Sequence, residues 1–243
     1  MARFFVTPEE FRKDFMVLVD KNAAHAKVLR IKVGEKVTVS DGQGNEAVCI
    51  VSDLSPGQVS LVVEKHSESV TEARVRVSVY MAFSKGDKFE HVLQKATELG
   101  AYEIIAFPSA RCVSKPDDKS LGKKLERWKK IAESAAEQCG RGIVPEVIVL
   151  KSYTEAVVRA AAADTAILFY ENERAFTLRE ALNQKKYHHV SLMTGPEGGL
   201  EEKEVKAAMD GGMKICTLGS RILRCETAPL CALSAVMYDA GEF

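Results

Sequence analysis

Two glycine-bearing turns occupy positions where α/β proteins bind ligands. The first turn, residues 194–199 (TGPEGG), follows the apolar run 189–193 and precedes an acidic helical start. The second turn, residues 218–227, lies between the apolar run 213–218 and a helical pattern over 228–240. In open α/β sheets, ligands lie outside the carboxyl ends of the strands, where glycine lets the backbone approach and helix N-termini offer free N–H groups. Two such turns close together in the sequence predict one ligand site.

Arg224 is the side chain of these turns that most clearly points to chemistry. It lies three residues before Thr227, which is the predicted N-cap residue of the last helix. Pro229 is predicted to lie in the first turn of that helix. A cation near a helix start gains nothing from the helix dipole, which favours anions. This placement suggests that Arg224 acts on a ligand.

Three further polar clusters follow the ends of predicted elements, at residues 109–112, 136–141 and 169–172. A site at the edge of a sheet would gather polar groups at such places. Each feature also has a plain structural interpretation. Arg141 could cap the last carbonyls of the preceding helix, and Gly198 with Gly199 could simply form a tight turn.

Composition sets limits on the class of protein. The 243 residues are 46% apolar, which suffices for one large domain or two modest ones. No apolar run has membrane-spanning length and the start lacks the order of a signal peptide, so a cytoplasmic protein is expected. The six cysteines form no C-x-x-C pair and no His lies at ligand spacing, so neither a zinc site nor a disulfide framework is indicated. Lys plus Arg equals Asp plus Glu at 34 each, so a nucleic-acid surface must be a local patch.

The first 70 residues have the pattern of a small β domain. Strand-like runs occur at 36–40, 46–51 and 59–63, and a hairpin loop with two glycines separates the first two. Segments 9–19 and 25–30 are predicted to be helical, which favours a small barrel with flanking turns. The polar segment 64–74 is the predicted linker.

Strand and helix signals alternate through the rest of the chain. This alternation predicts a mostly parallel sheet with helices on both faces. No G-x-G-x-x-G follows the first strand of this half and no G-x-x-x-x-G-K-[ST] is present, so two common nucleotide-binding folds lose their main support. The predicted strands are 75–83, 103–107, 146–150, 165–170, 189–193 and 213–218, and the predicted helices are 89–99, 121–139, 153–162, 176–184, a segment from 200 and 228–240.

Motifs along nearly the whole chain carry a family resemblance. Residues 194–199 followed by 218–228 resemble the signature of the RsmE family, which are small-subunit ribosomal RNA uridine-N3 methyltransferases of the SPOUT superfamily. Several ordered motifs make the resemblance specific. The other segments that resemble family motifs, in the same order, are 28–30, 41–42, 94–100, 109–112, 127–131, 137–141 and 144–146.

The resemblance implies a two-domain α/β architecture. Residues 1–70 would form a PUA-like β-barrel that helps to hold RNA, and residues 71–243 would form a SPOUT methyltransferase domain with a deep trefoil knot. Knots are nearly absent from proteins, so hydrophobic periodicity would not predict one. The resemblance also implies a homodimer in which each site is completed near the partner subunit.

The implied cofactor is S-adenosylmethionine, and no metal is implied. The knot would bring together the turns after Phe169, Thr194 and Leu218, which would bind the cofactor largely through backbone groups. The cofactor-binding residues implied in this way are Phe169, Tyr170, Glu171, Thr194, Gly195, Glu197, Gly198, Gly199, Leu218, Gly219, Ile222, Leu223 and Thr227.

Uridine N3 is a poor nucleophile because it keeps its proton at neutral pH. Catalysis should come from in-line positioning and from stabilising the negative charge that spreads onto O2 and O4. A guanidinium suits the second task, because its five donors stay charged, so Arg224 is the predicted catalytic residue. Glu197 is either a proton acceptor that points into the pocket or a hydrogen-bond acceptor within its turn.

The implied partner is 16S ribosomal RNA or the small ribosomal subunit, with no role for a membrane. Because N3 lies on the Watson–Crick edge, the target base must be unpaired or unstacked. The predicted phosphate or base contacts are Arg3, Arg30, Arg111 and Arg141.

Three departures from the family pattern are Ala110, Ser220 and Cys225, where the family usually has Glu, Pro and Thr. They affect details of the pocket and leave the class unchanged. Two alternatives stay open. One is another SPOUT-type RNA methyltransferase acting on a different base or a ribose 2′-oxygen, and the other is a non-catalytic RNA-binding protein of ribosome assembly.

Overall fold

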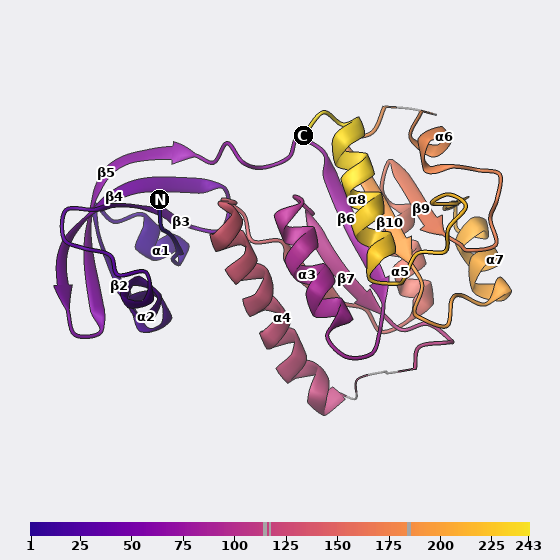
Figure 1. Ribbon diagram of the computed structural model, residues 1–243, viewed down its shortest axis with the longest axis horizontal. Coiled ribbons are helices and arrows are strands. Elements are labelled where there is room, and N and C mark those ends of the chain that lie inside the picture. Colours follow the sequence, from indigo (N-terminus) through magenta and orange to yellow (C-terminus); the bar gives the residue numbers. More distant parts are fainter. Residues whose placement is uncertain (114–115, 117, 184–185) are drawn as a thin grey trace. The chain divides into compact units, whose positions relative to one another are not determined.

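The apolar runs of the sequence form two separate sheets in the computed structural model of the chain (Figure 1). The structure describes all residues except 114–115, 117 and 184–185. The chain divides into two compact units, Met1–Glu72 with Ala136–Val144, and Ala73–Ala135 with Pro145–Phe243. In the part of the chain that is described, no helix is both long enough and apolar enough to cross a membrane.

The N-terminal unit is built on a sheet with the strand order β1-β3-β4-β5-β2. Only the β1–β3 pair of this sheet is parallel. Register shifts at Val48/Cys49 and Val51/Asp53 interrupt the long β4–β5 ladder, and such bulges bend a sheet. The strands are β1 (Arg3–Phe5), β2 (Phe15–Val19), β3 (Lys36–Ser40), β4 (Asn45–Ser55) and β5 (Gln58–Glu68), with helices α1 (Pro8–Phe11) and α2 (Asp20–Val28).

Two predictions for this unit are wrong. The predicted helix 9–19 is helical only at Pro8–Phe11, and Phe15–Val19 forms β2, which pairs antiparallel with β5. Met16 and Leu18 are buried while Phe15 and Val19 are exposed, so the run follows the two-residue period of a strand. The predicted linker 64–74 also begins too early, because β5 continues to Glu68.

A returning segment, Ala136–Val144, packs with the N-terminal unit around the Glu72 carboxylate. Glu72 accepts hydrogen bonds from Arg141 Nη2 at 2.7 Å and from the backbone N–H groups of Gly142 and Ile143 at 3.0 Å each. Ser40 Oγ donates to the Gly142 carbonyl at 2.9 Å. Arg141 is 5% exposed and is therefore buried, while the Glu72 side chain that pairs with it is 19% exposed. This cluster attaches the segment to the sheet.

Glu72→Ala is expected to destabilise the N-terminal unit by about 2–4 kcal/mol, because it removes the carboxylate that pairs with a buried guanidinium and accepts from two backbone N–H groups. Glu64→Ala is the matched control, since it breaks the exposed Lys36–Glu64 pair of the same sheet and should cost less than about 0.5 kcal/mol. Native-state hydrogen exchange of the β3 and β4 amides measures both changes. Equal effects of the two substitutions would contradict the buried cluster.

The second unit confirms the predicted parallel sheet. In the described residues its strand order is β11-β9-β10-β6-β7-β8, and every neighbouring pair is parallel. All residues of β7 and β9 are buried, as expected for strands covered on both faces. The strands are β6 (Arg76–Ala82), β7 (Glu103–Phe107), β8 (Glu146–Val149), β9 (Thr165–Phe169), β10 (His189–Thr194) and β11 (Lys214–Cys216).

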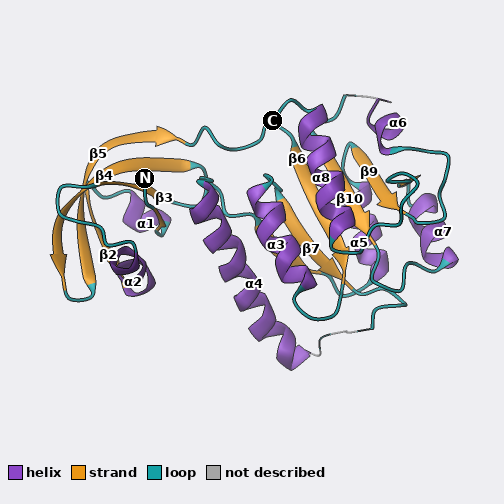
Figure 2. Cartoon of the chain, viewed as in Figure 1, coloured by secondary structure: helices purple, strands orange, loops and turns teal. Residues whose placement is uncertain are grey.

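Helices cover both faces of this sheet, as predicted (Figure 2). Helices α3 (Lys88–Glu98) and α8 (Thr227–Asp239) pack together on one face, where α8 contacts β6 and β10. Helix α5 (Tyr153–Ala161) packs with α7 (Glu202–Asp210) on the other face, which holds a core of Tyr80, Ile105, Phe107 and Leu168. The remaining helices are α4 (Asp118–Cys139) and α6 (Leu178–Asn183).

The start of α8 differs from its prediction. Thr227 is the first residue of the helix, and Glu226 is the N-cap residue without a side-chain capping bond. The N–H groups of Thr227 and Ala228 donate to the Arg224 carbonyl at 2.9 and 3.0 Å. Because the backbone of the turn satisfies these first donors, the helix starts without the predicted threonine cap. The predicted helix 176–184 is observed as Leu178–Asn183, and Gln184 lies outside the described residues.

Candidate functional site

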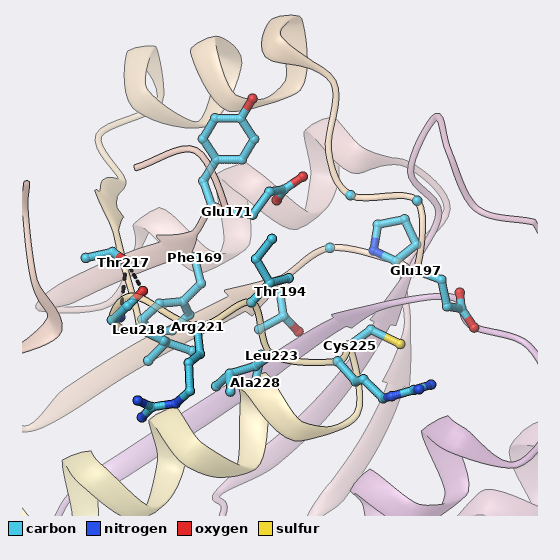
Figure 3. A pocket seen from close by; sticks show the side chains of 18 of the residues that line it. Phe169, Glu171, Thr194, Glu197, Thr217, Leu218, Arg221, Leu223, Cys225 and Ala228 are labelled. Carbon is cyan, nitrogen blue, oxygen red and sulfur yellow. Dashed lines mark hydrogen bonds between the residues drawn. The ribbon is translucent and has the colours of Figure 1, made fainter. Parts of the chain in front are cut away.

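A cavity of about 500 Å³ lies at the carboxyl ends of β9, β10 and β11. Its size falls within the range of small-molecule sites, roughly 300–1,000 Å³. Three loops and two helices contribute its walls (Figure 3). The lining residues are Phe169 at the end of β9 with Tyr170, Glu171 and Arg174 after it, Thr194 at the end of β10 with Gly195, Pro196, Glu197, Gly198 and Gly199 after it, Thr217, Leu218, Gly219, Arg221, Ile222, Leu223, Arg224 and Cys225 after β11, and Lys88 of α3 and Ala228 of α8.

The parallel register brings the three loops together. Phe169, the last residue of β9, pairs with both Thr194 of β10 and Cys216 of β11, so the three strands end at one level. The N–H of Tyr170 donates to the Cys216 carbonyl at 3.1 Å, and the N–H of Thr217 donates to the Phe176 carbonyl at 2.9 Å. These bonds fasten the β9 and β11 loops to each other beside the cavity.

The turn after β10 is held by its own packing. Thr194 is buried and its hydroxyl donates to the Tyr80 carbonyl at 3.3 Å. The N–H of Gly199 closes the turn on the Pro196 carbonyl at 3.0 Å. A Cβ atom on Gly195 would lie 2.9 Å from Cγ of the buried Leu200. Protein packing therefore already requires glycine at position 195, independently of any ligand.

The turn after β11 has a different requirement. The Thr217 hydroxyl donates to the Gly219 carbonyl and accepts from the Gly219 N–H, both at 3.1 Å (Figure 3). Gly219 has φ +104°, and nothing lies within 4 Å of the position that its Cβ would occupy. The positive φ, and not a steric contact, therefore favours glycine at this position.

Lys88 links the walls of the cavity through a charged cluster. Its Nζ lies 3.1 Å from Glu197 Oε1 and 3.6 Å from Glu226 Oε2. The backbone N–H of Lys85 also donates to Glu197 Oε1 at 2.9 Å. Burial alone would raise the pKa of Glu197, but the bonds from Lys85 and Lys88 outweigh it and hold the pKa below its ordinary value. Glu197 is therefore an ionised hydrogen-bond acceptor at neutral pH.

Cys225 joins the same cluster as a donor. Its Sγ donates to Glu226 Oε2 at 3.1 Å. Burial, and after it the hydrogen bond to Glu226, raises the pKa of the Cys225 thiol to about 12. The sulfur therefore stays protonated at neutral pH and is a poor nucleophile.

The structure brings together nearly all of the residues predicted for the cofactor. Every predicted cofactor-binding residue except Thr227 borders the cavity, and so does the exposed Arg224. Thr227 lies at the exposed start of α8. Sequence reasoning missed Lys88, Arg174, Arg221 and Thr217. Lys88 is more than one hundred residues away in the chain, and no local pattern marks it.

The four arginines predicted for RNA are in different settings. Arg3 pairs with Glu46 at 2.7 Å with its side chain 10% exposed, and Arg141 is buried against Glu72. Arg30 is exposed in the N-terminal unit. Arg111 is exposed in the second unit, where Nη1 donates at 3.3 Å to the Gly198 carbonyl of the cavity loop. Among the described residues, no group of His, Cys, Asp or Glu side chains is placed to hold a metal ion.

Family models define the class to which this fold and site belong. A model described as an RNA methyltransferase domain matches residues 71–237, which include every lining residue of the cavity. A model described as an RNA methyltransferase PUA domain matches residues 18–64. The class is an RNA methyltransferase preceded by a PUA domain.

Full-length relatives specify the family. The chain is 36% identical to ribosomal RNA small subunit methyltransferase E of Bacillus subtilis, over 98% of this chain and 97% of that protein. The crystal structure of the enzyme of that name from Neisseria gonorrhoeae, bound to S-adenosyl methionine, matches with a TM-score of 0.87 at 30% identity, covering 98% of this chain and 97% of the other. The chain belongs to the ribosomal RNA small subunit methyltransferase E family, which confirms the resemblance found in the sequence.

Proposed function

We propose that this chain transfers the methyl group of S-adenosylmethionine to N3 of a uridine in the 16S ribosomal RNA of the small subunit. The observation that carries the proposal is the cavity at the ends of β9, β10 and β11, which gathers both glycine turns and Arg224 in a chain of this family. The related gonococcal enzyme, with the same fold, holds S-adenosyl methionine. The chemistry of the cavity supports the same cofactor here.

The lining residues suit the parts of that cofactor. Leu218, Ile222 and Leu223 offer an apolar wall for a planar adenine, and Ile222 is 76% exposed at the cavity, where a ligand could cover it. Glu171 is an exposed carboxylate of the cavity that can accept hydrogen bonds from ribose hydroxyls. The cofactor, when bound, supplies a methyl group already activated on a sulfonium.

Arg224 then has the role of stabilising the uracil anion. Its guanidinium stays charged, can bridge two acceptors in one plane, and borders the cavity with its side chain exposed. The negative charge that appears on O2 and O4 as the N3 proton leaves is the kind of charge that such preorganised donors stabilise.

We assign Glu197 to positioning the β10 loop, because its carboxylate already accepts two hydrogen bonds from within the protein. Both bonds come from the region where α3 starts, and they hold the β10 loop against it. A carboxylate with a lowered pKa is also a weaker base for the uridine proton.

Glu197→Gln is accordingly expected to retain kcat within about fivefold of wild type, because general-base catalysis is worth far more, about 100- to 10,000-fold. The shape of the kcat profile against pH should stay the same, since Glu197 is ionised throughout the neutral range. Steady-state methyl transfer between pH 6 and 9 measures both quantities. If kcat of wild type rises with pH and kcat of the variant does not, Glu197 is the group that accepts the uridine N3 proton.

The N-terminal unit is proposed to hold the RNA as a PUA-like domain, residues 1–70, with Ala136–Val144 returning to it. Arg30 and Arg111 are the proposed direct contacts, because their side chains are exposed. Arg3 and Arg141 are proposed to shape the surface of the N-terminal unit, to which both belong, from within their ion pairs. The target uridine must be unpaired when it enters the cavity.

The assembly implied by the resemblance is proposed as well. The chain would act in the cytoplasm as a homodimer, with the β9, β10 and β11 loops threaded as a deep trefoil knot.

The proposed function is tested by incubating the protein with methyl-labelled S-adenosylmethionine and either unmodified 16S RNA or unmodified small subunits. Label should enter the RNA. Binding of S-adenosylmethionine without transfer to either substrate would instead favour a non-catalytic RNA-binding protein.

A further inference from the structure

Helix α4 carries a concentration of positive charge that the cavity does not use. The helix contains six Lys or Arg and four Asp or Glu, and all six cations lie between residues 119 and 130, whereas the whole chain has 34 of each sign. Lys119, Lys123 and Lys130 are all exposed. A local basic patch of this kind is what a chain without net charge needs to bind a polyanion.

The packing of α4 fixes which side of the helix faces solvent. Trp128, Ala132 and Ala135 are buried, and the Trp128 ring packs on Phe89 of α3 with centroids 4.6 Å apart. At about 100° per residue, the three lysines fall within an arc of about 40° on the side opposite Trp128. They form a single row about 16 Å long, at about 1.5 Å per residue. We call this row the α4 lysine face.

Among the described residues, the ammonium groups of this face are not engaged in ion pairs. Arg127, beside the row, pairs with Glu90 at 2.6 Å. None of the three lysine side chains makes a hydrogen bond or ion pair in the part of the chain that the structure describes. The three ammonium groups along this row repel each other, the exposed Glu126 between them offsets the repulsion only in part, and a polyanion of matching length would relieve the rest.

The chemistry of the face favours a phosphodiester backbone. None of the exposed large apolar side chains of the described chain lies on α4, although a membrane-binding helix would present such residues. A row about 16 Å long can meet several phosphates, and lysine ammonium groups are common phosphate contacts. We propose that the α4 lysine face binds the phosphate backbone of the small-subunit ribosomal RNA, an inference that rests on the proposed function.

Glu126 provides an internal check of this proposal. It is exposed and lies between Lys123 and Lys130, three residues after the first and four before the second. A carboxylate beside a phosphate backbone opposes binding, so Glu126→Gln should tighten RNA binding. A purely structural role of the face would not produce such a gain.

The test compares two triple variants in binding to unmodified 16S RNA, without cofactor, across a range of salt concentrations. Lys119→Ala/Lys123→Ala/Lys130→Ala should weaken binding about 10- to 100-fold near 0.1 M salt and reduce the slope of log K against log salt by about 2 to 3. Lys151→Ala/Arg179→Ala/Lys206→Ala is the matched control, because it removes three exposed cations from other elements of the same unit. The control should bind RNA as wild type does.

Methyl transfer separates this proposal from the proposed function. The α4 variant should have a raised KM for RNA, with kcat at saturating RNA and the Kd for S-adenosylmethionine unchanged. An α4 variant that binds RNA as tightly as the control would overturn the lysine face, even if wild type methylates 16S RNA. If wild type methylates no RNA but the α4 variant still loses RNA affinity, the lysine face stands and the proposed function fails. If wild type does not bind the RNA at all, the lysine face is wrong.

Discussion

Replacing Arg224 with alanine is expected to slow methyl transfer by about 100- to 1,000-fold, the range found when one donor to a developing anion is removed. The Kd for S-adenosylmethionine should change by less than about threefold, because the guanidinium is assigned to the base and not to the cofactor. The turn itself should survive, since it is the Arg224 backbone carbonyl that accepts the N–H groups of Thr227 and Ala228. Single-turnover methyl transfer and calorimetric titration of the cofactor measure the two effects.

Arg221 offers a control in the same turn. It also borders the cavity, and Figure 3 shows its side chain extending away from Glu197. Arg221→Ala removes the same charge, and we expect a loss in methyl transfer of less than about fivefold, the effect of a screened surface charge. Arg224→Lys should recover only part of the wild-type rate, because an ammonium cannot bridge two oxygens in one plane. Equal rates for Arg224→Ala and wild type would remove Arg224 from the mechanism.

Gly219→Val is expected to weaken binding of S-adenosylmethionine by about 30- to 100-fold. A β-branched residue at φ +104° would strain the backbone by about 2–3 kcal/mol. If S-adenosylmethionine binds only when the loop keeps its present conformation, this strain corresponds to the expected loss of affinity. A loop that relaxes instead would lose the two bonds between Thr217 and Gly219 and would alter the cavity wall. Calorimetry with S-adenosylmethionine measures the affinity.

Gly212→Val is the matched control for this change. Gly212 has φ +93°, its Cβ position also has nothing within 4 Å, and it does not border the cavity. The two variants should therefore lose similar thermal stability, while Gly212→Val keeps the affinity of wild type for the cofactor. If both variants bind the cofactor equally well, the second turn is not part of its site.

Much of the α/β unit could be predicted from the sequence, because its signals are local. Strands such as Glu103–Phe107 and Thr165–Phe169 are short apolar runs between helical patterns, and both are observed as β7 and β9. The two glycine turns were predicted to form one site, and the parallel register of β9, β10 and β11 does bring them to one cavity.

The features that were missed depend on contacts between distant segments. Phe15–Val19 becomes a strand because β5 offers it a partner some 40 residues later, and this pairing overrides the helical interpretation. Lys88 reaches Glu197 and Glu226 across more than one hundred residues. The return of Ala136–Val144 to the first unit depends on Glu72, which in sequence is one glutamate in a polar stretch. No local pattern encodes such pairings.

The product nucleoside tests the central claim most directly. The protein is incubated with S-adenosylmethionine and unmodified small subunits or their 16S RNA, the RNA is digested to nucleosides, and the methylated nucleoside is identified by mass spectrometry against synthetic standards. The account predicts 3-methyluridine, formed with wild type and nearly absent with Arg224→Ala. A methylated base other than uracil, or a 2′-O-methylated ribose, would contradict it.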